Sequence, residues 1–415
     1  MTEKAPPDDI AAVIARLVRA ERGRLLSVLI GALKDFQLAE DCLQDAFEAA
    51  LVHWRRSGLP HSPEGWLVAV ARRKAIDRLR RAANFAGKSD EIAFLLENAM
   101  AGEGEEIGAI ADERLKLVFI CCHPALERKT AVALTLRSVL GLSTEDVAAA
   151  FLDMPSAMAQ RLVRARHKIA RAGIAFAEPE PEDFADRLSG VLAVIYLAFN
   201  EGYAASGAER LRVDLCEEAI RLARLLAELV PGEAEIEGLV SLMLLHHARS
   251  DARTAEDGMP LTLEEQDRRR WRAHEIAEGT AILHRALRRG RPGHYQLQAA
   301  IAALHAEAPS FAETDWRQIE LLYRVLAEGS DNPVHELNRI AALSHLEGAG
   351  PALLRLKAVA PALTGYQPFH ALHADLLAKI GAPEAADAYR RAIALSSSEP
   401  ERRFLQARLE ALPKR

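Results

Sequence analysis

Residues 62–81 read SPEGWLVAVARRKAIDRLRR, and both their apolar and their charged positions recur at helical spacing. Serine followed by proline suits the start of a helix, because serine caps it and proline fits an early helical position. The expected buried face carries Leu67, Val68, Ala71, Ala75 and Leu79. The opposite face is basic, with six Lys or Arg among residues 72–81. The stretch therefore predicts an amphipathic helix whose exposed side can bind a polyanion.

The composition of the whole chain favours an all-helical protein. Half of its 415 residues are hydrophobic, only 5% are aromatic, and no convincing strand pattern appears. This length predicts roughly two to four domains, because it exceeds what one core serves. The formal net charge is −6, so a basic helix is a local feature of an acidic chain. Neither an apolar signal core nor a stretch of about 18 apolar residues is found, so we expect a cytoplasmic protein without membrane contact.

A second amphipathic pattern precedes the basic helix. Its apolar stripe runs from Leu38 to Trp54 at three- and four-residue spacing. The other face is expected to be acidic and polar, and it carries Glu40, Asp41, Gln44, Asp45 and Glu48. Such a face is either simply solvated or docks on a basic helix of a partner.

A helix-turn-helix pattern follows an acidic segment. Residues 83–112 lose the helical periodicity, which predicts a flexible linker. Ser143 with Asp146 three positions later indicates a capped helix start. After a turn, a second helix buries an apolar stripe and exposes Ser156, Ala157, Gln160, Arg161, Arg164 and Lys168. Arginine and glutamine on such a helix suit base reading in the major groove, although surface helices of ordinary bundles also carry arginine.

These motifs, in this order, resemble the bacterial sigma-70 family. Leu38–Phe47 is similar to region 2.2, residues 65–81 are similar to regions 2.3 and 2.4, and residues 142–171 are similar to region 4.2. Only regions 2 and 4 have counterparts, as in extracytoplasmic-function (ECF) sigma factors. The segment FICCHPAL at 119–126 and the helical tail further resemble the ECF subgroup with a C-terminal tetratricopeptide (TPR)-like extension. The resemblance covers essentially the whole chain.

The resemblance implies an all-α chain with a region 2 bundle, a region 4 helix-turn-helix domain and a TPR-like repeat domain. Region 2 would span 1–82, the acidic linker 83–112, region 4 113–175 and the regulatory extension 183–415. The implied partners are promoter DNA and core RNA polymerase, through its β′ clamp helices and β flap. The clamp helices would contact Asp41, Gln44, Asp45 and Glu48.

The resemblance also implies two sets of DNA contacts. The −10 element would meet Arg72, Arg73, Lys74, Asp77, Arg80 and Arg81, with Trp66 either stacking on opened bases or lying in the core. The −35 element would meet Ser156, Ala157, Gln160, Arg161, Arg164 and Lys168. Arg73 stands where many members carry asparagine, which leaves the −10 base preference open. Ala157 replaces a hydroxyl residue, so one contact is missing there.

The tail from residue 183 onward predicts helix after helix. Its last unit places large and small residues of a TPR template at Phe369, Leu372, Leu376, Ala385, Tyr389 and Ala392. Such a solenoid binds a protein segment or a small ligand. Polar and aromatic residues interrupt the apolar helices, and they either line a groove or act as internal struts, among them Tyr203, Gln266, Arg268, Trp271, Gln296 and Trp316.

Other classes of function are less well supported by the sequence. His370, His373 and Asp375 lie within six residues, but the sequence fixes no further ligand and has no HExxH pattern that would complete a metal site. We expect no enzyme activity and no cofactor, because no phosphate loop, nucleophile elbow or paired-carboxylate site appears. Four cysteines without a CxxC pair predict reduced structural thiols. The alternatives are a helix-turn-helix repressor or activator with a ligand-sensing helical domain, and a scaffold whose basic stretches are merely solvated.

Overall fold

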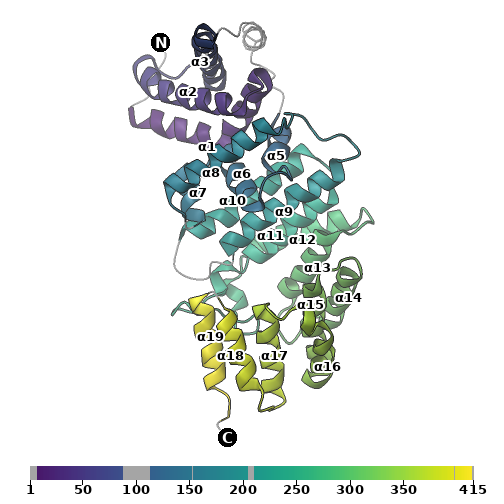
Figure 1. Cartoon of the computed structure of the whole chain (residues 1–415). Coiled ribbons are helices and arrows are strands. Elements are labelled where there is room, and N and C mark those ends of the chain that lie inside the picture. The colour runs from purple at the N-terminus through teal and green to yellow at the C-terminus, as the bar shows by residue number, and fades with distance from the viewer. Residues whose placement is uncertain (1–6, 87–112, 152, 204–209, 397, 414–415) are drawn as a thin grey trace. The chain divides into compact units, whose positions relative to one another are not determined.

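The computed structural model describes residues 7–86, 113–151, 153–203, 210–396 and 398–413 (Figure 1). Within these residues the secondary structure consists of α-helices and short 3-10 helices. The β-pairing among them is limited to one isolated bridge between Thr254 and Pro260. The all-α fold class predicted from the sequence is therefore confirmed.

The chain divides into two compact units, Met1–Glu201 and Gly202–Arg415. The helices of the first unit are α1 (Pro7–Leu33), α2 (Phe36–Ser57), α3 (Pro63–Ala86), α5 (Arg114–Cys121), α6 (Arg128–Ser138), α7 (Thr144–Ala150), α8 (Pro155–Arg171) and most of α9 (Phe184–Tyr203). The predicted linker at 83–112 lies mostly outside the described residues. The other predicted domain limits stay predictions.

Helices α2 and α3 form where the sequence predicts them. Asp35 caps α2 by accepting a 2.9 Å hydrogen bond from the Leu38 amide. The Ser62 hydroxyl accepts a 3.3 Å hydrogen bond from the Gly65 amide at the start of α3. The apolar stripe of α2 is buried, and its fully buried side chains include Cys42, Leu43, Ala46, Ala50 and Trp54. Burying one Leu side chain contributes about 1.5–3 kcal/mol, so this stripe supplies much of the stability that joins α1, α2 and α3.

The predicted helix-turn-helix pattern corresponds to α7 and α8. Ser143 and Asp146 form a complete capping box at the start of α7, each side chain accepting from the other residue's backbone amide. Pro155 opens α8 at its first turn. The buried side chains of α8 include the predicted stripe, Met158, Leu162, Ala165 and Ile169. Helix α6 packs against α7 and α8. Seven of its eleven residues are buried, which is the pattern of a central helix.

Two glycines permit the close approach of α1 to the segment before α7. A Cβ at Gly23 would lie 2.4 Å from the carbonyl oxygen of Val139. Gly141 has φ +77°, and a Cβ there would lie 2.6 Å from the Val18 carbonyl oxygen. Because backbone atoms cannot move aside easily, a side chain at either position would push these elements apart.

The second unit is a succession of helices in which chain neighbours pack on one another, for example α14 on α15 and α17 on α18. Its elements are α10 (Arg210–Leu229), α11 (Ala234–His247), η2 (Ser250–Ala252), η3 (Arg268–Arg270), α12 (Ala273–Leu287), α13 (His294–Glu307), α14 (Trp316–Glu328), α15 (Pro333–Glu347), α16 (Ala349–Val359), η4 (Ala360–Ala362), α17 (Gln367–Lys379), α18 (Ala385–Leu395) and α19 (Glu399–Glu410). The helical C-terminal domain expected from the sequence is confirmed.

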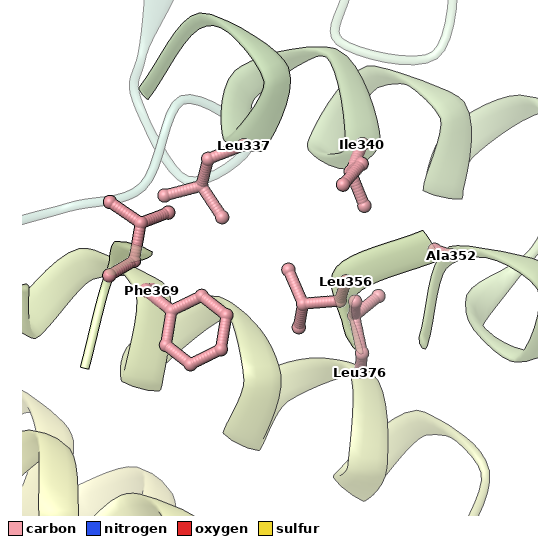
Figure 2. Packing of buried hydrophobic residues seen from close by; sticks show 7 residues of the cluster. Leu337, Ile340, Ala352, Leu356, Phe369 and Leu376 are labelled. Atoms are coloured by element: carbon pink, nitrogen blue, oxygen red, sulfur yellow. The ribbon is translucent and has the colours of Figure 1, made fainter. Parts of the chain in front are cut away.

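One core cluster shows how these helices are held together (Figure 2). Leu337 and Ile340 of α15 face Leu356 of α16, and Phe369 and Leu376 of α17 close the cluster. All five side chains are buried. A further cluster joins α17, α18 and α19 through Ala374, Ala388, Tyr389, Ala392 and Leu405. The helices of these two clusters are therefore stabilised by packing on their neighbours in the chain, a pattern that helical repeats share.

The four cysteines are free and buried, in agreement with the predicted structural thiols. Burial is the first cause that raises the pKa of Cys42 to about 11, and that of Cys122 and Cys216 to about 12. The thiolate is the reactive form. The pKa of Cys42 thus lies two units above the ordinary thiol value of 9.0, which lowers its thiolate fraction at pH 8. We therefore expect its alkylation in the native chain at pH 8 to be about 100-fold slower than after unfolding.

Iodoacetamide labelling followed by mass spectrometry measures this difference for each cysteine. Rapid labelling of any of the four in the native chain would contradict the structural role.

Among the described residues, no helix combines the length and the apolarity that a bilayer crossing needs. No three His, Cys, Asp or Glu side chains among them come together as metal ligands, and His370 instead hydrogen-bonds the Thr364 carbonyl through Nε2 at 2.8 Å.

Candidate nucleic-acid interface

Helix α3 presents its cations in two groups. Arg73, Arg80 and Arg81 are exposed together with Asp77, and their spacing puts them along one side of the helix. Lys74 and Arg78 instead turn toward the acidic side chains of α2. Arg72 is half-buried, and its Nε has no hydrogen-bond partner within the described structure. The exposed group is the part of α3 that is available to a polyanion.

The acidic face of α2 is also divided. The Arg78 guanidinium lies 2.8 Å from the Asp45 carboxylate and 3.6 Å from that of Asp41. Lys74 Nζ lies 3.9 Å from the Asp45 carboxylate. Gln44 and Glu48 remain exposed, and a 3.3 Å hydrogen bond joins them. Asp41 and Asp45 thus help to fix α3, whereas Gln44 and Glu48 face solvent. The sequence interpretation placed Arg78 in the basic stretch but did not predict its ion pairs with Asp41 and Asp45.

Trp66 is packed but not fully enclosed. Its ring stacks on His53, with centroids 5.5 Å apart, and meets the buried Trp54 ring edge-on at 5.4 Å. The residue is half-buried. The ring therefore has a core contact on one side and is partly accessible on the other, and its stacking on opened bases stays a prediction.

The exposed side of α8 carries most of the residues predicted to face DNA. Ser156, Ala157, Gln160, Arg164 and Lys168 are exposed. Arg161 is half-buried, and its guanidinium lies 2.9 Å from the Asp153 carboxylate in the preceding turn. That ion pair orients Arg161 at the N-terminal half of the helix, where recognition helices contact base edges.

The opposite side of α8 joins α2 through a buried carboxylate. Glu40 is only 4% exposed, so the prediction that it lies on the solvated acidic face was wrong. Its carboxylate lies 2.5 Å from the Arg166 guanidinium, 2.9 Å from that of Arg22 and 3.7 Å from that of Arg137. Arg166 Nε also donates a 2.6 Å hydrogen bond to Gln37. We call Glu40, Arg22, Arg137 and Arg166 the Glu40 cluster.

The Glu40 cluster carries more positive than negative charge in a buried place. Burial, followed by the nearby Arg137, lowers the pKa of Arg22 to about 10. Glu40 partly offsets this effect by its attraction and its hydrogen bond. One carboxylate therefore makes the burial of several guanidiniums tolerable, and it ties α1, α2, α6 and α8 into one unit.

Comparisons with known proteins agree with this arrangement in part. Residues 17–85 match the family Sigma-70 region 2, and residues 187–287 match a family of unknown function (DUF6596). A protein of Rhizobium meliloti (strain 1021) called "Uncharacterized protein R00370" is 41% identical over 402 residues, which cover 94% of each chain. No solved structure matches the chain.

Proposed function

We propose, from the match of residues 17–85 to Sigma-70 region 2, that the chain is an RNA polymerase sigma factor of the ECF type. In this proposal it binds core polymerase and directs initiation at promoters with a −10 and a −35 element. Its second unit is a TPR-like extension that modulates this activity. Sigma-70 family proteins are not enzymes, and we propose no catalytic activity here.

The observation that carries the proposal is the arrangement of α2, α3 and α8. Two helices, α3 and α8, have exposed basic faces, and the acidic helix α2 contacts both of them. A repressor needs one recognition helix per subunit, whereas a factor that reads two unlike elements needs two. Phosphate neutralisation by these cations would supply much of the affinity for DNA.

For α3, the proposal assigns −10 contacts to the exposed Arg73, Asp77, Arg80 and Arg81, with Arg72 and Lys74 beside them. The accessible part of the Trp66 ring can stack on an unpaired base. For α8, it assigns −35 contacts to the exposed side, Ser156, Ala157, Gln160, Arg161, Arg164 and Lys168. Arginine and glutamine there can pair with guanine and adenine in the major groove.

The polymerase contact is assigned to Gln44 and Glu48, with Asp41 and Asp45 at its edge. Glu48→Lys places a positive charge on the face proposed to meet a basic helix, so like charges would oppose each other. We expect the dissociation constant for core polymerase to rise by about tenfold or more. Fluorescence anisotropy of the labelled full chain, titrated with core enzyme, measures this change.

Glu182→Lys is the matched control, because Glu182 is exposed in the same unit and the net charge changes equally. Asp45→Lys is less informative, since it also breaks the contact to Arg78. Equal binding by the Glu48→Lys and Glu182→Lys variants would remove α2 from the proposed docking surface.

Run-off transcription tests the function as a whole. The full chain and core RNA polymerase are incubated with a library of promoter fragments, and core enzyme alone is the control. Promoter-specific transcripts that depend on the chain would support the proposal. Absence of transcripts together with tight binding of the free chain to a palindromic duplex would replace it with the repressor alternative.

A further inference from the structure

Three arginines gather in the second unit, in the segment between α11 and α12. Arg249 and Arg253 flank the short helix η2, and Arg268 opens η3. All three are half-buried. The sequence left open whether Arg268 and the neighbouring Tyr203 and Trp271 line a binding site or act as internal struts. Their contacts now distinguish these alternatives.

Arg249 and Arg253 meet at Tyr203. Arg249 Nη2 donates a 2.8 Å hydrogen bond to the Tyr203 hydroxyl. Arg253 Nη1 donates to the Tyr203 carbonyl oxygen at 2.6 Å, and its guanidinium carbon lies 3.6 Å from the centre of the Tyr203 ring. Two guanidiniums are thus held side by side by one tyrosine, although like charges repel.

Arg268 joins them through Trp271. The guanidinium carbons of Arg268 and Arg249 lie 4.5 and 5.8 Å from the centre of the Trp271 ring. Arg268 Nη1 donates to the carbonyl oxygens of His305 and Ala308 at 2.6 and 2.8 Å. We call Arg249, Arg253 and Arg268 the arginine cluster.

The arginine cluster lacks a carboxylate partner within the described part of the chain. Neighbouring arginines do have one: Arg269 lies 2.9 Å from the Asp267 carboxylate, and Arg272 lies 3.0 Å from that of Asp251. The excess positive charge also acts on the adjacent His246 and His305. Burial first, and then Arg249, lower the pKa of His246 well below its usual value and that of His305 to about 4.

Several buried polar atoms beside the arginine cluster have no hydrogen-bond partner in the described structure. They are Arg268 Nη2, Trp271 Nε1 and His305 Nδ1. Trp271 is only 6% exposed. A strut would satisfy its own donors, because a buried donor without an acceptor destabilises the fold. Unpaired donors next to unneutralised cations are instead what a site for an anionic group requires.

We propose that the arginine cluster, with Trp271, binds the oxyanion group of a small ligand, either a carboxylate or a phosphate. Guanidinium forks match both groups and bind them with charge-assisted hydrogen bonds. The guanidiniums lie over the aromatic rings of Tyr203 and Trp271, which help to hold the forks in place. This site is independent of the proposed contacts with polymerase and DNA, because it is formed by residues of the second unit alone.

Isothermal titration calorimetry of the full chain tests the site. Inorganic phosphate and benzoate serve as probes, and chloride keeps the ionic strength constant. We expect saturable binding of at least one probe, and the tighter probe identifies the oxyanion. Arg268→Gln removes one fork and should weaken that binding by about tenfold or more.

Arg269→Gln is the matched control, because Arg269 is 90% exposed and already paired with Asp267. It should change the dissociation constant by less than about twofold. Arg253→Lys keeps the charge but loses the fork, so it tests the site even if Arg268→Gln fails to fold. Binding of neither probe, or equal loss in the Arg268→Gln and Arg269→Gln variants, would overturn the proposal.

Discussion

Replacement of Glu40 by glutamine should lower the free energy of unfolding of the first unit by about 3–5 kcal/mol. Glu40 is the carboxylate shared by Arg22, Arg137 and Arg166, and both Glu40 and Arg22 are almost fully buried. A glutamine of similar size leaves the guanidiniums without a counter-charge in a place that water does not reach. The loss therefore exceeds that of an ordinary surface ion pair, which contributes about 0–1 kcal/mol.

Hydrogen exchange of the full chain, followed by mass spectrometry at increasing urea concentration, measures this loss separately in α2 and α8. Glu48→Gln is the matched control, because it makes the same chemical change on the exposed side of the same helix. Similar protection of α8 in the two variants would mean that the Glu40 cluster does not hold the helices together.

The second large effect concerns the outer side of α8. Combined replacement of Arg161 and Arg164 by alanine should reduce initiation from a −35-dependent promoter by about 100-fold. Each arginine that pairs with a base contributes about 1–3 kcal/mol, and roughly 1.4 kcal/mol is a factor of ten. Arg161 is oriented by Asp153, and Arg164 is exposed. Binding to core polymerase should not change, because neither residue lies on α2.

Run-off transcription with each variant, on a promoter identified with the unmodified chain, measures the effect. A variant with Arg128→Ala and Lys129→Ala is the charge-matched control, since both residues are exposed at the start of α6, outside the proposed contacts with polymerase and DNA. If this control lost as much activity as the α8 variant, general attraction to DNA would explain the loss rather than base reading.

The two experiments are independent although they concern one helix. Arg161 and Arg164 lie toward the outer side of α8, whereas Arg166 lies on the inner side and contacts Glu40. A folding defect should appear in hydrogen exchange, and a recognition defect should appear in transcription with exchange unchanged.

Much of the local structure was predictable because it depends on residues that are close in the chain. The capping box of Ser143 and Asp146, the start of α3 at Ser62, and the apolar stripes of α2 and α8 follow from three- and four-residue spacing. The same spacing correctly separated most exposed cations of α3 and α8 from the core.

The all-α class, the helices and their amphipathic faces thus follow from local sequence patterns. Which charges are paired depends on the packing of the helices. The pattern along α2 placed Glu40 on its acidic face, and burial of a lone carboxylate would be costly. In the fold Glu40 is buried, because arginines from three other helices supply its partners. Arg78 and the arginine cluster of the second unit are also defined by contacts between segments far apart in the chain. Such pairings depend on how the helices pack, and no spacing rule along one helix contains that information.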